Sequence, residues 1–99
     1  MATVRPLNLR FSARARAQLI AIQEYLRDRA PAAEARVGTA IREASELLRF
    51  FPHAGRPGRS AGTREWVVHG LPYIIVYEVD PKNEEIIVLS VFHGAQRRG

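Results

Sequence analysis

The sequence predicts an α+β domain of two layers, in which a hairpin of two α-helices packs on one face of a predominantly antiparallel sheet. Three observations predict it: an alternating segment near the N-terminus, two successive stripes of helical periodicity, and two β-branched segments in the C-terminal half. The expected order of elements is β-α-α-β-β-β. Because 99 residues suffice for one hydrophobic core of ordinary size, we expect a single domain over residues 1–99.

The first half of the chain provides one expected strand and both helices. Residues 7–11 alternate apolar and polar side chains, which is typical of a half-buried strand, and Pro6 favours a position near the sheet edge. Ser12 can accept a backbone hydrogen bond as the N-cap of a helix over residues 13–29. Pro31 cannot continue this helix but suits the first turn of the next one, so the helices should form a hairpin with a very short turn.

The second half of the chain provides the remaining strands. Residues 52–62 are rich in proline and glycine and form an expected loop that contains two arginines and no acidic residue. One strand is expected over residues 64–69. Residues 73–79 are β-branched and aromatic and apolar on both faces, which favours the central strand, and residues 85–93 supply the last one. Tight turns join these three strands, so we expect them to be antiparallel.

Composition and motifs exclude several classes of function. The chain has no cysteine, which excludes disulfides, thiol nucleophiles and cysteine-ligated metals. Its 3 histidines are dispersed and no nucleotide-binding or hydrolase fingerprint occurs, so neither a metal nor a cofactor is expected. No segment is long and apolar enough to span a membrane and no secretory signal is evident, so we expect a cytoplasmic protein without a membrane partner.

The chain is strongly basic. Its 15 lysine and arginine residues outweigh 10 acidic residues, the formal net charge is +5, and only Lys82 is a lysine. Such a surface suits either a polyanion or an acidic protein, since the planar guanidinium binds phosphate and carboxylate equally well. An arginine-rich codon usage would give the same ratio without any function, so charge alone does not choose between these interpretations.

Cations, aromatic residues and one histidine remain as candidates for function: Arg56, Arg59, Arg64, Tyr73, Tyr77, His93 and Arg97. Such a set could cleave RNA without a metal, with the histidine moving a proton, arginines stabilising the phosphorane and a tyrosine stacking on a base. The alternation equally places Tyr73 and Tyr77 in the core. His93 shares its expected strand face with three apolar residues, Ile87, Leu89 and Val91, where a structural histidine is the alternative.

Over essentially its whole length the chain resembles the toxins of the RelE/ParE superfamily, which belong to bacterial type II toxin–antitoxin systems. The motifs that carry the resemblance, in order, are Phe11-Ser12, Pro31-Ala32-Ala33, Pro52-x-x-Gly55-Arg56, Arg64-Glu65, Pro72-Tyr73-Ile74-Ile75-x-Tyr77 and His93-Gly94. The resemblance implies a helix hairpin packed on an antiparallel sheet, which is the architecture expected above. It also implies a cognate antitoxin, an acidic-tailed and partly disordered protein that binds the toxin in a hetero-oligomeric complex.

The superfamily holds two activities, and one position separates them here. In the branch that cleaves mRNA on the ribosome, the central strand carries an arginine that contacts the scissile phosphate, whereas the matching residue of this chain is Ile74. The resemblance therefore favours the ParE-like branch, whose members inhibit DNA gyrase, with no catalytic residue. The alternative is a ribosome-dependent, metal-independent mRNA endonuclease that uses Arg56, Arg59, Arg64 and His93. A third possibility is an inactive module that only holds an antitoxin.

Contacts with target or partner can be assigned only from charge and position. The candidate residues are Arg56, Arg59, Arg64, Tyr73, His93 and Arg97. A basic chain suits an acidic antitoxin electrostatically, so we expect a high-affinity complex that weakens as salt is added. DNA gyrase is the expected target.

Overall fold

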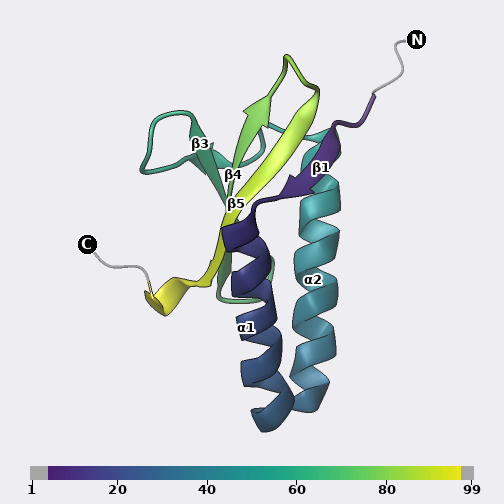
Figure 1. Cartoon of the computed structure of the whole chain (residues 1–99), viewed down its shortest axis with the longest axis vertical. Helices are drawn as coiled ribbons and strands as arrows, with labels where there is room; N and C mark the ends of the chain where they lie inside the picture. Colours follow the sequence, from purple (N-terminus) through teal and green to yellow (C-terminus); the bar gives the residue numbers. More distant parts are fainter. Residues whose placement is uncertain (1–4, 97–99) are drawn as a thin grey trace.

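The structure is a computed structural model that describes residues 5–96, and it confirms the two-layer α+β architecture (Figure 1). Its elements, in chain order, are β1 (Asn8–Phe11), α1 (Ala13–Arg29), α2 (Pro31–Phe50), β2 (Arg56–Pro57), β3 (Thr63–Val67), β4 (Tyr73–Asp80), β5 (Glu85–His93) and the 3₁₀ helix η1 (Gly94–Gln96). The sequence predicts both helices and three of the strands, β1, β4 and β5, at the places where the structure has them. The expected and observed ends of these elements differ by no more than about one residue.

The helical hairpin is built by local signals. The Ser12 hydroxyl accepts a hydrogen bond from the Ala15 amide at 3.1 Å and so caps α1, as expected. Only Ala30 separates α1 from α2, which begins at Pro31 because proline suits the first turn of a helix. Figure 1 shows the two helices side by side, with their connected ends projecting beyond the sheet.

The five strands form one mixed sheet in the order β1-β5-β4-β3-β2. The strand β1 lies at an edge and β4 lies in the middle, and both positions confirm the expectation. β1 pairs with β5 in parallel, while the other neighbours are antiparallel. The expected order lacked β2, which lies inside the segment interpreted as a loop. With two residues β2 is too short to show an alternating pattern, and its Pro57 is tolerated because this strand forms the sheet edge.

A β-bulge interrupts the pairing of the two longest strands. Val76 of β4 is opposite Ser90 of β5, but the next residue, Tyr77, is opposite Val88, so Leu89 is an extra residue on β5. A bulge of this kind bends its strand and changes which residues face each side of the sheet. The face assignment of β5 therefore differs on the two sides of Leu89.

This bulge corrects one expectation about His93. The sequence placed four residues on one face of β5, namely Ile87, Leu89, Val91 and His93. In the structure Ile86 and Val88 belong to the core before the bulge and Val91 belongs to it afterwards. His93 therefore lies on the side of Val91, opposite Tyr73, and not on the side of Ile87. One extra residue in a strand reverses which of the following residues face the core, and the residue types of β5 do not reveal this insertion.

The core lies between the helices and the sheet. Leu48 of α2, Ile75 and Tyr77 of β4 and Val88 of β5 are fully buried, and Tyr73 is 8% exposed. The core placement of the two tyrosines, one of the alternatives from the sequence, is thus confirmed. Within residues 5–96, every buried side-chain nitrogen and oxygen has a hydrogen-bond partner. No helix in this part of the chain is long and apolar enough to cross a membrane.

Candidate functional site

Residues 52–64, here called the arginine hairpin, connect α2 to β3 and carry three of the candidate residues. The segment leaves α2, pairs with β3 as the short strand β2 and returns through a turn that projects from the sheet edge beside β3 (Figure 1). The turn is closed by a hydrogen bond from the Gly58 amide to the Thr63 carbonyl at 2.8 Å and by one from the Thr63 hydroxyl to the Ser60 carbonyl at 2.6 Å. The candidate residues are therefore held on an ordered surface.

Arg64 lies at the base of the arginine hairpin and donates to backbone carbonyls. Its Nη1 is 2.8 Å from the Gly55 oxygen and 3.4 Å from the His53 oxygen. Arg64 is directly opposite Tyr77 in the β3–β4 pairing, so the two side chains share the sheet face that carries the core. Its guanidinium thus holds the chain that precedes β2.

Tyr77 makes the second connection to the same segment. Its buried hydroxyl accepts a hydrogen bond from the Gly55 amide at 2.9 Å and donates one to the Pro52 carbonyl at 2.8 Å. Burial raises the pKa of Tyr77 above its ordinary value, although the Gly55 hydrogen bond and the Arg64 charge act in the opposite direction. The phenol therefore keeps the proton that it donates.

Gly55 is required here by close approach. A Cβ at this position would lie 2.6 Å from the Tyr77 hydroxyl and 2.8 Å from the Glu65 carbonyl, whereas Gly62 and Gly70 serve as turn residues with positive φ. The sequence places Gly55 in an expected loop, and this expectation did not include the contact with Tyr77. The signal available was the Pro52-x-x-Gly55-Arg56 motif, whose purpose appears only when β4 is placed beside it.

The side chain of Arg56 lies on the face of the sheet opposite to that of Arg64. Its Nη2 is 3.3 Å from Glu65 Oε1, and the Glu65 side chain is 4% exposed whereas that of Arg56 is 61% exposed. Arg56 and Glu65 are opposite each other in the β2–β3 pairing, and Glu65 follows Arg64, so these side chains point away from the Arg64 face. Glu65 is a residue that sequence reasoning did not connect with Arg56. Arg59 lies exposed in the turn.

Tyr73 and His93 form a second group at the opposite end of β4. They are directly opposite in the β4–β5 pairing, and their rings meet edge to face with centroids 5.4 Å apart. The Nδ1 atom of His93 accepts a hydrogen bond from the Ala95 amide at 3.0 Å. Burial raises the pKa of Tyr73, and the negative charge that Tyr25 acquires at high pH raises it further. Arg97, the remaining candidate, lies outside the described residues.

The Tyr73 group borders a groove of about 780 Å³ between α1 and the ends of β4 and β5. Gln18 of α1 contributes to its wall, and its Oε1 accepts hydrogen bonds from the Val91 amide at 2.8 Å and the Ser90 hydroxyl at 3.0 Å. This amide covers the part of the β5 edge that β1 leaves unpaired, since β1 ends opposite Val88. Tyr25 also lines the groove and is 57% exposed.

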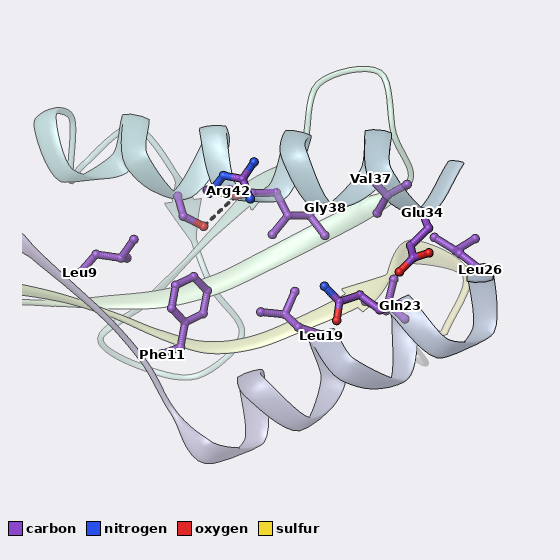
Figure 2. Close-up of a pocket in the computed structure, with 12 residues that line it drawn as sticks. Leu9, Phe11, Leu19, Gln23, Leu26, Glu34, Val37, Gly38 and Arg42 are labelled. Atoms are coloured by element: carbon purple, nitrogen blue, oxygen red, sulfur yellow. Dashed lines mark hydrogen bonds between the residues drawn. The ribbon is translucent and has the colours of Figure 1, made fainter. Parts of the chain in front are cut away.

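A smaller cleft of about 240 Å³ lies between the two helices beside β1, as Figure 2 shows. Its apolar lining comes from β1, α1 and α2, with Phe11, Leu19 and Val37 among the contributing residues. Gln23 and Glu34 add polar groups. Among the described residues no group of three histidine, aspartate, glutamate or cysteine side chains is placed to hold a metal ion.

Among the described residues, the structure does not assemble the candidate arginines and His93 into one reactive centre. Tyr73 and Tyr77 are four residues apart on β4, which corresponds to about 13 Å along the strand. Arg64 lies beside Tyr77 with its guanidinium on the Gly55 carbonyl, whereas His93 lies beside Tyr73 on the other side of β4. The candidate residues that the structure describes therefore divide between the arginine hairpin and the groove.

Comparison with known proteins identifies the family. Residues 9–98 match the family described as the ParE toxin of the type II toxin-antitoxin system parDE. The chain is 37% identical over 89 residues to a protein of Sinorhizobium fredii named "Putative toxin Y4kP", and the match covers 90% of each chain.

Two solved structures share the fold. A chain of the chromosomal ParDE system from P. aeruginosa matches with a TM-score of 0.78 and 23% identity over 88% of this chain and 95% of that one. A chain of the RelBE2 toxin–antitoxin complex from Mycobacterium tuberculosis matches with a TM-score of 0.60 and 24% identity over 94% and 97%. The chain thus belongs to the ParE toxin family of type II toxin–antitoxin systems, a branch of the RelE/ParE superfamily.

Proposed function

We propose that this toxin inhibits DNA gyrase by binding it, without catalysing a reaction, and that a cognate antitoxin neutralises it. The single observation that carries the proposal is the separation of Arg64 from His93 described above. A nuclease needs its proton-transferring group and its charge-stabilising groups around one phosphate. A surface that binds an enzyme has no such requirement.

The central strand supports the same choice. Ile74 occupies the position at which the mRNA-cleaving branch carries an arginine, and it is 8% exposed between Val67 of β3 and Phe92 of β5. An isoleucine cannot stabilise developing charge, and loss of such a group costs about 10²–10³-fold in rate. The ParDE structural relative has the higher TM-score of the two, which agrees with this interpretation.

The two candidate regions then take different roles. The arginine hairpin, with Arg56 and Arg59 exposed, is the surface we assign to gyrase and its bound DNA, because arginine suits both carboxylate and phosphate. The groove beside His93 and the cleft in Figure 2 are predominantly apolar, so they suit an amphipathic antitoxin segment. The net charge of +5 favours acidic residues in that antitoxin.

A supercoiling assay with purified toxin and gyrase tests the proposal. We expect inhibition together with accumulation of cleaved DNA, and relief when the antitoxin is added first. The paired substitution Arg56→Ala and Arg59→Ala should weaken inhibition, whereas Arg36→Ala on the exposed surface of α2 should not. Supercoiling that continues unchanged in excess toxin would contradict the proposal.

The two alternatives give different results. Primer extension on translated mRNA would show cleavage sites for an endonuclease, and His93→Ala would abolish them. Overproduction that leaves growth normal would instead favour a module that only holds the antitoxin. Salt titration of the toxin–antitoxin complex tests the charge argument, since a basic interface should weaken as ionic strength rises.

A further inference from the structure

We propose that Tyr77 and Arg64 act as a clamp that fixes the arginine hairpin in the orientation in which it meets its target, so that Arg64 is a positioning residue and not a target contact. The inference rests on the proposed function only in treating the hairpin as the target-binding surface. The clamp itself is a statement about these two side chains and the backbone of residues 52–55.

Four backbone groups in this short segment are bound by two side chains. The Tyr77 hydroxyl donates to the Pro52 carbonyl at 2.8 Å and accepts from the Gly55 amide at 2.9 Å. The Arg64 guanidinium donates to the Gly55 carbonyl at 2.8 Å and to the His53 carbonyl at 3.4 Å. Backbone groups in a surface loop ordinarily satisfy themselves with water. Here both the amide and the carbonyl of Gly55 are held by side chains, so this residue cannot rotate without breaking the clamp.

Both side chains of the clamp start from the sheet. Tyr77 is fully buried on the central strand β4, and Arg64 lies directly opposite it on β3. The bulge at Leu89 lies between Val76 and Tyr77 in the pairing with β5, and bulges change the direction of neighbouring side chains. The hairpin is therefore attached to the buried centre of the sheet as well as to the end of α2.

The way Arg64 is used separates it from Arg56. Arg56 is ion-paired with Glu65, but within residues 5–96 Arg64 forms no ion pair and donates only to carbonyls. Both carbonyls are bound by the same atom, Nη1, which ends a side chain one bond longer than that of lysine, so a lysine keeps the charge but places its nitrogen short of the two carbonyls. Charge and positioning can therefore be distinguished by experiment.

A fixed hairpin binds more tightly because less conformational freedom is lost on binding. When only a fraction of the molecules holds the binding geometry, the apparent affinity falls by that fraction. Loosening residues 52–55 should thus weaken target binding, although the contacting residues Arg56 and Arg59 are unchanged.

The test combines amide hydrogen exchange with gyrase inhibition for Tyr77→Phe, Arg64→Lys and the double variant. Tyr77→Phe keeps the buried ring and removes only the hydroxyl. We expect the Gly55 amide to exchange about tenfold faster while the amides of β4 and β5 keep their protection. Gyrase inhibition should weaken about tenfold in each single variant, and antitoxin affinity should change less than twofold. Arg36→Lys, at an exposed position on α2, is the matched control and should resemble the unmodified toxin.

Non-additivity is the decisive result. If both residues act through the same segment, the double variant should be no more than about twofold weaker than the weaker single variant. Full inhibition by Arg64→Lys would show a charge contact and overturn the clamp, as would unchanged Gly55 exchange in Tyr77→Phe. If the unmodified toxin leaves gyrase active, the proposed function fails, while the exchange data still decide whether the clamp exists.

Discussion

Replacement of Gly55 by alanine is the most direct test of how tightly the arginine hairpin is attached to the sheet. The added methyl group would lie 2.6 Å from the Tyr77 hydroxyl, 2.8 Å from Tyr77 Cε1 and 2.8 Å from the Glu65 carbonyl. Carbon atoms in contact normally stay about 3.5–4.0 Å apart. Because Tyr77 is enclosed by the core and Glu65 belongs to β3, residues 52–55 have to move away.

The cost follows from the contacts that this movement breaks. Overpacking of a closed site costs about 1–3 kcal/mol. The two hydrogen bonds of the Tyr77 hydroxyl contribute about 0.5–1.5 kcal/mol each. We therefore expect Gly55→Ala to lower the free energy of unfolding by about 3 kcal/mol, which corresponds to a fall of about 12–24 °C in Tm for a domain of this size.

Gly38→Ala is the matched control, since a Cβ at that position of α2 meets nothing within 4 Å. Alanine is favoured over glycine inside a helix by about 0.5–1 kcal/mol, so this variant should be slightly more stable than the original chain. Urea denaturation followed by circular dichroism measures both variants. A Gly55→Ala protein within about 0.5 kcal/mol of the original chain would refute the reasoning.

Three further predictions address capping, packing and ionisation. Ser12→Ala removes the cap of α1 and the bond from its hydroxyl to the Leu89 carbonyl, so urea denaturation should show a loss of about 1–2 kcal/mol, and an unchanged midpoint would argue against this cap. Leu48→Ala empties a fully buried position and should cost about 2–5 kcal/mol in the same measurement, unlike a truncation at the helix surface. The side chain of Asn83 is the main cause of the lowered pKa of Asp80, so Asn83→Ala should raise this pKa toward its ordinary value of 3.8 in an NMR titration. Because folding lowers the pKa of Asp80, its carboxylate stabilises the fold at pH values above the ordinary pKa, and this stabilisation is lost as the pH falls through the folded pKa. An Asp80 pKa that is the same in Asn83→Ala and in the original chain would exclude the Asn83 contact.

Most of the fold was predictable because its signals are local. A serine cap, a proline at the first helical turn and two long β-branched segments each fix an element through nearby residues. The centre of the sheet followed from the segment around Ile75, which is apolar on both faces. The edge position of β1 followed from Pro6.

The missed features depend on how one strand pairs with another. The strand β2 has two residues and gains its identity only from its register with β3. The extra residue Leu89 exists only relative to β4, so alternation within β5 could not reveal it. Both are properties of pairs of strands, whereas the sequence displays one strand at a time.

The candidate site was predictable in residue type but not in role. Charge singled out Arg56 and Arg64, yet the structure places one on the buried Glu65 and the other on backbone carbonyls. Backbone acceptors leave no trace in a sequence, so an arginine that holds a loop looks like one that meets a partner. Tyr77 was assigned correctly to the core, but its hydroxyl connection to Pro52 was not foreseen.

The insertion of β5 between β1 and β4 also governs when the fold can form. The first residue of β1, Asn8, pairs with Glu85, so β1 cannot join the sheet until β5 has been synthesised. Contacts across such long stretches of chain slow folding. A nascent chain that has not yet reached Glu85 has no neighbour for its first strand. The finished protein, and any harm it does to a cell, therefore arises only after translation has passed the final strand.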